Sequence, residues 1–231
     1  MVLGQDGNLY GTTSEGGAYG GGTVFKLTPA GVETVLWAFG AGTDGKTPKG
    51  RLLQANDGNF YGTTESGGAL TFGAVYKLTP SGVETVLYSF AFGTDGQGPE
   101  GLTQAPDGDL FGITIGGGSY SVGTAFKITT SGVETQLWTF GNGSDGRNPD
   151  AAPLLGADGN FYGVTGNGGT SGLGTLYRLT PDGNETVLWN FKEREGSFPF
   201  STLTQGPDGT IYGTTYRGGS AGGGVIFKLA M

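Results

Sequence analysis

Asp57-Gly58-Asn59-Phe60-Tyr61-Gly62-Thr63-Thr64 decides the fold of this chain, because close variants of this stretch recur along the whole sequence. The other copies occupy residues 6–13, 107–114, 158–165 and 208–215. Successive copies lie about 50 residues apart, a period typical of repeat architectures. In each copy an Asp-Gly pair predicts a tight turn, and the aromatic and β-branched residues after it predict a strand.

The second repeat shows what lies between the copies. Strands are predicted at 52–55, 60–64, 74–78 and 83–90, and they are separated by short turns at 56–58 and 79–82 and by a Gly-rich loop at 65–73. No stretch of the chain shows helical periodicity. Four short strands repeated at this period are typical of a β-propeller blade. The sequence therefore predicts an all-β, five-bladed β-propeller with four antiparallel strands, A to D, in each blade.

The repeats divide the chain without a domain boundary. We expect a single domain over residues 1–231, with repeats at approximately 1–49, 50–99, 100–150, 151–200 and 201–231. The inner A strands are predicted at 1–3, 52–55, 102–105, 153–156 and 203–206. The fifth repeat stops after its third strand, so the last blade is predicted to be three-stranded. We expect the ring to close by packing of the first blade on the last.

Composition excludes several classes of function. The formal net charge of −8 disfavours nucleic acid and anionic membranes as partners, because both attract clustered Lys and Arg. The chain has no Cys and no His, which removes thiolate nucleophiles, the commonest general base and the usual transition-metal ligands. It has no signal peptide at its first residues and no apolar run long enough to insert into a membrane. We expect no cofactor.

The loops divide into two classes that mark the two faces of the predicted disc. The A–B and C–D turns are short and uniform, whereas the B–C and D–A loops are long and varied, and in an up-and-down blade each class shares one face. Binding residues gather on variable loops of rigid scaffolds. The varied face is therefore the predicted ligand face, near the axis or between blades, with these candidate residues: Tyr19, Asp44, Asp95, Tyr120 and Asp145.

These loops do not predict a metal site. Ca²⁺ prefers several oxygen ligands from one loop, and each D–A loop offers a single carboxylate beside glycines. Turn formation by Asp-Gly explains those carboxylates better.

Two sets of residues recur at equivalent positions of the repeats, and both are explained better by folding than by function. Lys26, Lys77, Lys127 and Arg178 each precede a glutamate by seven residues: Glu33, Glu84, Glu134 and Glu185. These positions are expected to face each other across the C–D hairpin as ion pairs worth about 0.2–1 kcal/mol each.

Strand D carries Trp or Tyr (Trp37, Tyr88, Trp138, Trp189) and, two residues later, Phe (Phe39, Phe90, Phe140, Phe191). These stripes could stack sugars, but burial between blades is favoured.

No catalytic residues are predicted. No serine has a histidine to activate it, and a carboxylate pair for glycoside hydrolysis is the remaining route. Most carboxylates occupy repeated positions that turns and ion pairs explain. The exceptions include Glu15, Glu65, Asp150, Glu193 and Glu195, which are scattered over several loops.

The repeated residues resemble the bacterial "choice-of-anchor tandem repeat GloVer" family. The resemblance rests on Asp57 to Thr64, Gly67-Gly68, residues 73–79 and residues 84–90, and it covers nearly the whole chain five times over. The blade layout is also similar to kelch repeats, although the twin-Gly and Trp pattern of kelch is only partly present. The resemblance implies a secreted or surface-anchored bacterial protein, and it brings no catalytic residues. The chain itself lacks a signal or anchor segment, so we expect a fragment or a recombinant form of a longer protein.

Three functions remain open at this point. A module that binds a carbohydrate or another cell-surface ligand is favoured, a purely structural surface scaffold comes second, and a carboxylate-based glycoside-active enzyme comes third. Self-association is also expected, because the third strand of the last repeat, between Val225 and Leu229, would be an open edge. The alternative is that the next residues of a longer array supply the missing strand.

Overall fold

The computed structural model describes residues 1–230 and contains twenty strands in five antiparallel sheets, one for each repeat. Blade 1 consists of β1 (Val2–Leu3), β2 (Leu9–Thr13), β3 (Thr23–Leu27) and β4 (Glu33–Ala38). Blade 2 consists of β5 (Lys46–Gln54), β6 (Phe60–Ser66), β7 (Ala74–Leu78) and β8 (Glu84–Ser89). Blade 3 consists of β9 (Gln97–Gln104), β10 (Leu110–Gly116), β11 (Thr124–Ile128) and β12 (Glu134–Thr139).

In blade 4 the inner strand is split in two. This blade consists of β13 (Gly146–Pro149), β14 (Leu154–Leu155), β15 (Phe161–Gly168), β16 (Thr175–Leu179) and β17 (Glu185–Asn190), and both β13 and β14 pair with β15. Blade 5 has three strands within the described residues: β18 (Thr204–Gln205), β19 (Ile211–Thr214) and β20 (Ile226–Leu229). The all-β propeller architecture is confirmed. No helix that could cross a membrane occurs in residues 1–230.

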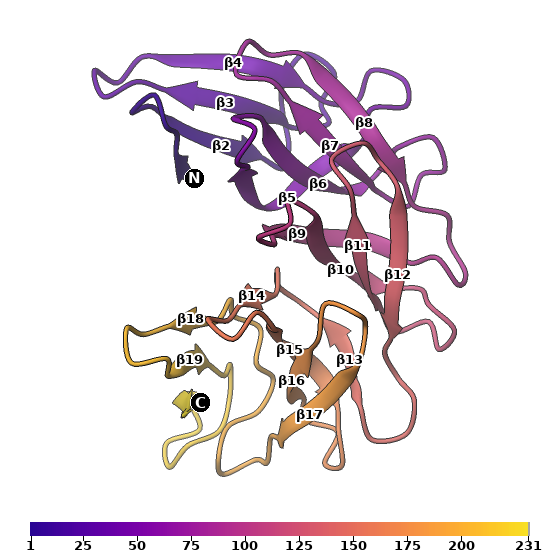
Figure 1. Ribbon diagram of the computed structural model, residues 1–231, viewed down its shortest axis with the longest axis vertical. Coiled ribbons are helices and arrows are strands. Elements are labelled where there is room, and N and C mark those ends of the chain that lie inside the picture. Colours follow the sequence, from indigo (N-terminus) through magenta and orange to yellow (C-terminus); the bar gives the residue numbers. More distant parts are fainter. Residues whose placement is uncertain (231) are drawn as a thin grey trace.

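The blades follow one another around an arc, with the first strand of each blade on the inner side (Figure 1). Each blade packs face to face on the next, and four apolar clusters lie at the four junctions. Between blades 1 and 2 the rings of Tyr10 and Phe60 lie 4.1 Å apart, and between blades 3 and 4 the rings of Phe111 and Phe161 lie 4.0 Å apart. Since each blade is two-sided, most of the core is interface between blades.

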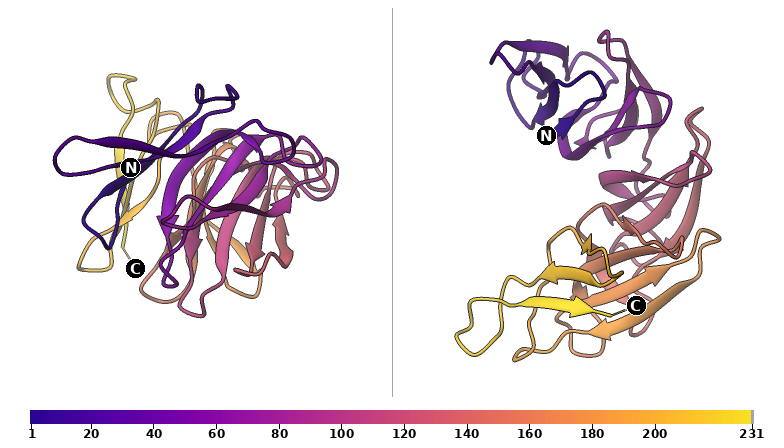
Figure 2. Two further views of the ribbon diagram at one scale, coloured as in Figure 1. Left: turned by 90° about the horizontal axis from the view of Figure 1, so that it is seen from above. Right: turned by 60° about the vertical axis from the view of Figure 1, so that its left-hand side comes forward.

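The arc does not close, so the expected packing of the first blade on the last is wrong. Blades 1 and 5 end on opposite sides of an opening, as two further views also show (Figures 1 and 2). No apolar cluster within residues 1–230 joins them. The packing of side chains at each junction sets the angle between neighbouring blades, and the four junctions together do not bring blade 5 round to blade 1.

The inner strands of blades 2 and 3 are longer than the sequence predicts. β5 starts at Lys46 and β9 starts at Gln97, so half of each strand lies in what was expected to be a D–A loop. A break in register separates the halves of β5 between Lys49 and Leu53, and Gly50 has a φ of +71° there. Such bulges bend a strand and redirect its side chains.

The C–D hairpins have a register that excludes the expected ion pairs. Lys26 lies opposite Thr34, and Glu33 lies opposite Leu27. A shift of one residue places a side chain on the other face of a sheet. The reason is the turn, in which the Thr28 amide donates to the Val32 carbonyl at 2.9 Å, so that residues 27 and 33 form the last opposed pair. Blades 2, 3 and 4 repeat this register.

Candidate axial site

The inner strands bring a variable position of the repeat together at the axis of the arc. Each of four repeats has a proline in the first half of its inner segment (Pro48, Pro99, Pro149, Pro199), and the next residue differs every time. These next residues are Lys49, Glu100, Asp150 and Phe200. Together with Glu65 from β6 and with Arg51, they form a group that we call the axial site. It lies at the end of the arc that carries the B–C and D–A loops.

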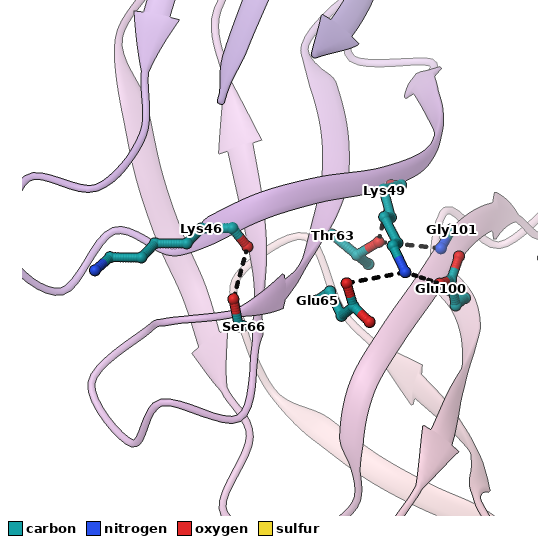
Figure 3. Close-up of polar contacts among 7 residues, drawn as sticks. All are labelled: Lys46, Lys49, Thr63, Glu65, Ser66, Glu100 and Gly101. Atoms are coloured by element: carbon teal, nitrogen blue, oxygen red, sulfur yellow. Dashed lines mark hydrogen bonds and ion pairs between the residues drawn. The ribbon is translucent and has the colours of Figure 1, made fainter. Parts of the chain in front are cut away.

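Thr63 of β6 holds two neighbouring inner strands in place at this site (Figure 3). Its buried hydroxyl donates to the Lys49 carbonyl at 3.4 Å and accepts a hydrogen bond from the Gly101 amide at 3.0 Å. The strands approach closely here, because a Cβ on Gly50 would lie only 2.8 Å from the Gly101 nitrogen. The backbone beneath the charged side chains is therefore fixed by blades 2 and 3 together.

Lys49 lies among three carboxylates. Its Nζ is 2.9 Å from Glu65 Oε2 and 3.9 Å from Glu100 Oε1 (Figure 3). The hydrogen bond that Lys49 donates to Glu65 raises the pKa of Lys49, with smaller contributions from the charges of Glu65, Glu100 and Asp150. Lys49 therefore stays charged and links an acidic group on its own blade to one on the next.

The remaining carboxylates are only partly neutralised. Burial raises the pKa of Glu100 to about 7, against the lowering effect of the Lys49 charge, and the nearby charges of Asp150 and Glu65 raise it further. Burial also raises the pKa of Asp150 above its ordinary value. Glu100 can thus exchange a proton near neutral pH, which suits a group that donates or accepts a hydrogen bond to a ligand.

A hollow of about 370 Å³ opens beside these groups. Glu100, Asp150 and Phe200 line it, together with Arg51 and the small residues of the inner strands. A larger hollow of about 670 Å³ continues along the axis toward the A–B turns and shares Arg51 with the first. Side chains of all the blades from 1 to 5 line this inner space, so the arc encloses an axial channel on three sides.

The chemistry of the axial site suits a polar organic ligand. Lys49 and Arg51 offer hydrogen-bond donors, Glu65, Glu100 and Asp150 offer acceptors, and the exposed ring of Phe200 offers an apolar face. No group of three or more His, Cys, Asp or Glu side chains in residues 1–230 has a geometry that could hold a metal ion.

The three aspartates predicted as ligand residues lie in the D–A loops and hold these loops to strand D. Asp44 accepts hydrogen bonds from Trp37 Nε1 at 3.2 Å and from the Gly40 amide at 3.0 Å. Asp145 makes the same contacts with Trp138 and Gly141, at 3.2 and 2.8 Å, and Asp95 accepts from Tyr88 and Ala91, at 2.9 and 2.6 Å. Each carboxylate is therefore used within its own blade.

The two predicted tyrosines lie on B–C loops, next to the glycines whose amides bind Asp44 and Asp145: a Cβ on Gly40 would lie 3.0 Å from the Tyr19 carbonyl oxygen, and a Cβ on Gly141 would lie 2.8 Å from the Tyr120 Cβ. Tyr19 and Tyr120 are 63% and 49% exposed. Tyr120 borders a shallow hollow of about 280 Å³ beside Gln136 and Trp138 of β12. A role in ligand binding for any of the five predicted residues stays a prediction.

The axial site contains residues that the sequence alone leaves scattered or does not single out. Of the residues noted as isolated exceptions to the repeat, Glu65 forms an ion pair with Lys49, and Asp150 is close enough for its charge to raise the pKa of Lys49. Lys49 and Glu100 are missed. The available signal is the position after the recurrent proline, which changes from repeat to repeat while the proline itself recurs in four of them and a small residue follows.

Comparisons with known proteins agree with the repeat and the fold. The family described as the Gloeobacter/Verrucomicrobia repeat matches residues 1–115 and 57–231. No curated protein matches the chain. A streptogramin B lyase structure has a TM-score of 0.65 and 19% identity, over 98% of this chain and 66% of that chain.

Two further solved structures are similar at low identity. Inactive virginiamycin B lyase from Staphylococcus aureus, with quinupristin, has a TM-score of 0.62 and 19% identity, over 100% of this chain and 72% of that chain. The extracellular domain of a one component system from B. thetaiotaomicron has a TM-score of 0.64 and 12% identity, over 95% of this chain and 26% of that chain. The chain thus spans about two thirds of the first lyase, and at these identities the likeness concerns the fold alone.

Proposed function

Because the chain belongs to the Gloeobacter/Verrucomicrobia repeat family and folds as a row of propeller blades, we propose that it is a non-catalytic binding module. Its ligand site is the axial site, and its ligand is a glycan or another polar ligand of a cell surface. The observation that carries this proposal is the hollow of about 370 Å³ lined by Glu100, Asp150 and Phe200. These are variable residues on a constant scaffold, which is the arrangement expected of a specificity site.

The composition of the chain supports a role without catalysis. It has no His and no Cys, so the commonest bases and nucleophiles are absent. The lyase from Staphylococcus aureus is catalytically inactive when one histidine is replaced by alanine, and this chain has no histidine to take such a part. The carboxylates near Lys49 include an ion-paired Glu65, which is poorly suited to act as a free acid or base.

A glycan array followed by titration of the strongest binder tests this function. E100Q and F200A are expected to weaken binding at least about tenfold, the loss of one or two good contacts. E193Q, on an exposed loop outside the axial site, is the matched control and should bind as the parent chain does. Binding that survives both axial substitutions would move the site elsewhere, and a chain that binds nothing would favour the structural scaffold. Release of new reducing ends from a bound glycan would instead reveal a glycosidase.

The proposed setting is outside the cell, on the surface that bears the parent protein. The similar extracellular domains from B. thetaiotaomicron support this setting. Protease treatment of intact cells that make the parent protein tests the proposal. We expect the protease to digest this chain on intact cells, so that antibodies against it no longer detect it. A chain that is digested only after the cells are lysed would contradict the proposal.

A further inference from the structure

The face of blade 5 that points away from blade 4 exposes side chains whose equivalents are buried in every other blade. We call the side of a blade that packs on the next blade its forward face, and the side that packs on the preceding blade its backward face. On the forward face of blade 5, Tyr212 is 39% exposed and Ile226 is 80% exposed. Their equivalents on blades 1 to 4 are no more than 2% exposed. The equivalents of Tyr212 are Tyr10, Tyr61, Phe111 and Tyr162, and those of Ile226 are Val24, Val75, Ala125 and Leu176.

The backward face of blade 1 is the complementary surface. Leu9, Phe25 and Leu27 are partly exposed there, and Leu3 is 66% exposed. In blades 2, 3 and 4 the residues equivalent to these three are buried against the preceding blade. The equivalents of Leu9 are Phe60, Leu110 and Phe161; those of Phe25 are Tyr76, Phe126 and Tyr177; and those of Leu27 are Leu78, Ile128 and Leu179. Each open face therefore has the character of one half of an internal junction.

A pair of residues at the inner end of each junction indicates which blade follows which. At three junctions a glutamine of the following blade accepts a hydrogen bond from a backbone amide in the A–B turn of the preceding blade. These bonds are Gln5 N to Gln54, Asn56 N to Gln104 and Ala157 N to Gln205, at 2.9, 2.9 and 3.0 Å.

The fourth junction replaces this polar pair with an apolar one. The turn of blade 3 has Pro106, which has no N–H to donate, and blade 4 has Leu155 in place of the glutamine. The turn of blade 5 also has a proline, Pro207, so its forward neighbour should carry an apolar residue at the glutamine position. Blade 1 has Leu3 there, and it is the one blade within residues 1–230 whose backward face is free.

We propose that the forward face of blade 5 binds the backward face of blade 1 of a second copy of this chain. In this contact Tyr212 packs on Leu9, Ile226 covers Phe25, and Pro207 meets Leu3, as the equivalent residues do at the junction of blades 3 and 4. The opening of the arc keeps these two faces apart within one copy (Figure 1). The interface differs from pairing of β20 edges, because it joins blade faces and leaves the edge strand unpaired.

The geometry of this contact determines the kind of assembly. Each copy has one face of each kind, so the contact is head-to-tail and joins copies in series, either into a ring or into a filament. Blade 5 has three strands within residues 1–230, so the contact made by these residues is shorter than an internal junction and is expected to be weak. Each copy carries a net charge of −8, and screening of this repulsion by salt should strengthen the assembly.

Sedimentation equilibrium of the whole chain and of two charge variants tests the proposal. I226E places a carboxylate on the forward face of blade 5, and L3E places one on the backward face of blade 1; both residues are largely exposed, so folding should be preserved. V133E, at an apolar residue 63% exposed on the C–D turn of blade 3, adds the same charge elsewhere. The parent chain and V133E are expected to exceed twice the monomer mass at high concentration, and each face variant alone should stay monomeric.

A mixture of the two face variants gives the sharpest result. L3E keeps a good forward face and I226E keeps a good backward face, so the mixture should form a one-to-one dimer and nothing larger. A parent chain that is monomeric at every concentration would overturn the proposal. Association that L3E leaves unchanged would also overturn it, and would point to pairing of β20 edges instead.

Discussion

Three glutamates at one repeated position make the stability of the protein depend on pH. Glu84, Glu134 and Glu185 each start strand D of their blade, and the register of the hairpin turns them away from Lys or Arg and toward the preceding blade. One carboxylate oxygen of each is buried without a hydrogen-bond partner within the described residues. Burial, followed by the charge of an aspartate in the preceding blade, raises the pKa of each to about 7.

The free energy of unfolding is therefore expected to rise as the pH falls from about 8 to about 5. The folded protein holds the proton up to a pH of about 7, whereas the unfolded chain releases it near 4.5, so the folded state binds more protons between these values. The effect is about 1 kcal/mol for each glutamate, because partial exposure reduces it. Urea denaturation at several pH values measures it. The E84Q/E134Q/E185Q variant should lose most of the slope, and a parent chain with stability that rises with pH in this window would disprove the cause.

The aspartate of the repeated Asp-Gly turn is a second residue whose contacts can be weighed. Asp57 accepts hydrogen bonds from the Tyr61 hydroxyl and from Asn59 at 2.8 Å each, which ties the turn to strand B. D57N should cost about 1–2 kcal/mol of unfolding free energy, because a charged acceptor is lost beneath a buried tyrosine. Asp107 is the matched control, since Phe111 has no hydroxyl and Asp107 accepts only from the Asp109 amide. Equal losses in D57N and D107N, measured by urea denaturation, would remove the tyrosine from the explanation.

At the scale of elements, the inner strands are shaped by close approach of neighbouring blades. Gly101, in β9, has a φ of +58°, and a Cβ there would lie 2.9 Å from the Cβ of Ala152. This contact fixes the path of the strands beneath Glu100 and Asp150. The residue at position 101 therefore has to be small if the axial site is to keep its form.

G101A tests this packing against a control with the same backbone strain. Gly143 has a φ of +70° and open space around the position of a Cβ. Both substitutions add the cost of a left-handed residue, about 1 kcal/mol, but only G101A adds a steric clash. We expect G101A to lose at least about 1 kcal/mol more than G143A in thermal or urea unfolding. Indistinguishable losses would mean that the inner strands part easily and that the site is not rigid.

The sequence predicts the outer strands and the second half of the inner strand well, and it misses the first half of the inner strand in blades 2, 3 and 4. Strands B, C and D follow apolar and aromatic runs bounded by Asp-Gly or Pro-x-Gly turns, and the structure has them where they are expected. The first half of strand A reads as a loop, because Gly45, Pro48 and Gly50 are typical of turns, yet contact with the next blade holds it extended. The register of the C–D hairpin changes if the turn is one residue longer or shorter, and the composition of the turn does not specify its length.

The axial site is hidden from the sequence for a different reason. Its members come from four repeats and share only an equivalent position, so each looks like a single exception to a pattern. Lys49, Glu65 and Glu100 become neighbours only when blades 2 and 3 are stacked. The general location, the varied face near the axis, could be predicted from loop length, whereas the residues could not.

At the scale of the whole molecule, the blades form an open arc with an axial channel. The curvature is set by the four packed junctions, each of which buries aromatic rings from both blades. The opening would leave the proposed ligand site accessible from the side of the arc as well as from its ends. It also separates the two faces that are proposed to join successive copies.

Small-angle X-ray scattering of the L3E variant at low concentration tests this open arc most directly, since that variant removes association between blade faces. We expect a scattering curve that fits the arc of Figure 1, with the distances between blades 1 and 5 present as a separate population in the pair-distance distribution. A curve that fits a closed, evenly filled disc of five blades would contradict it.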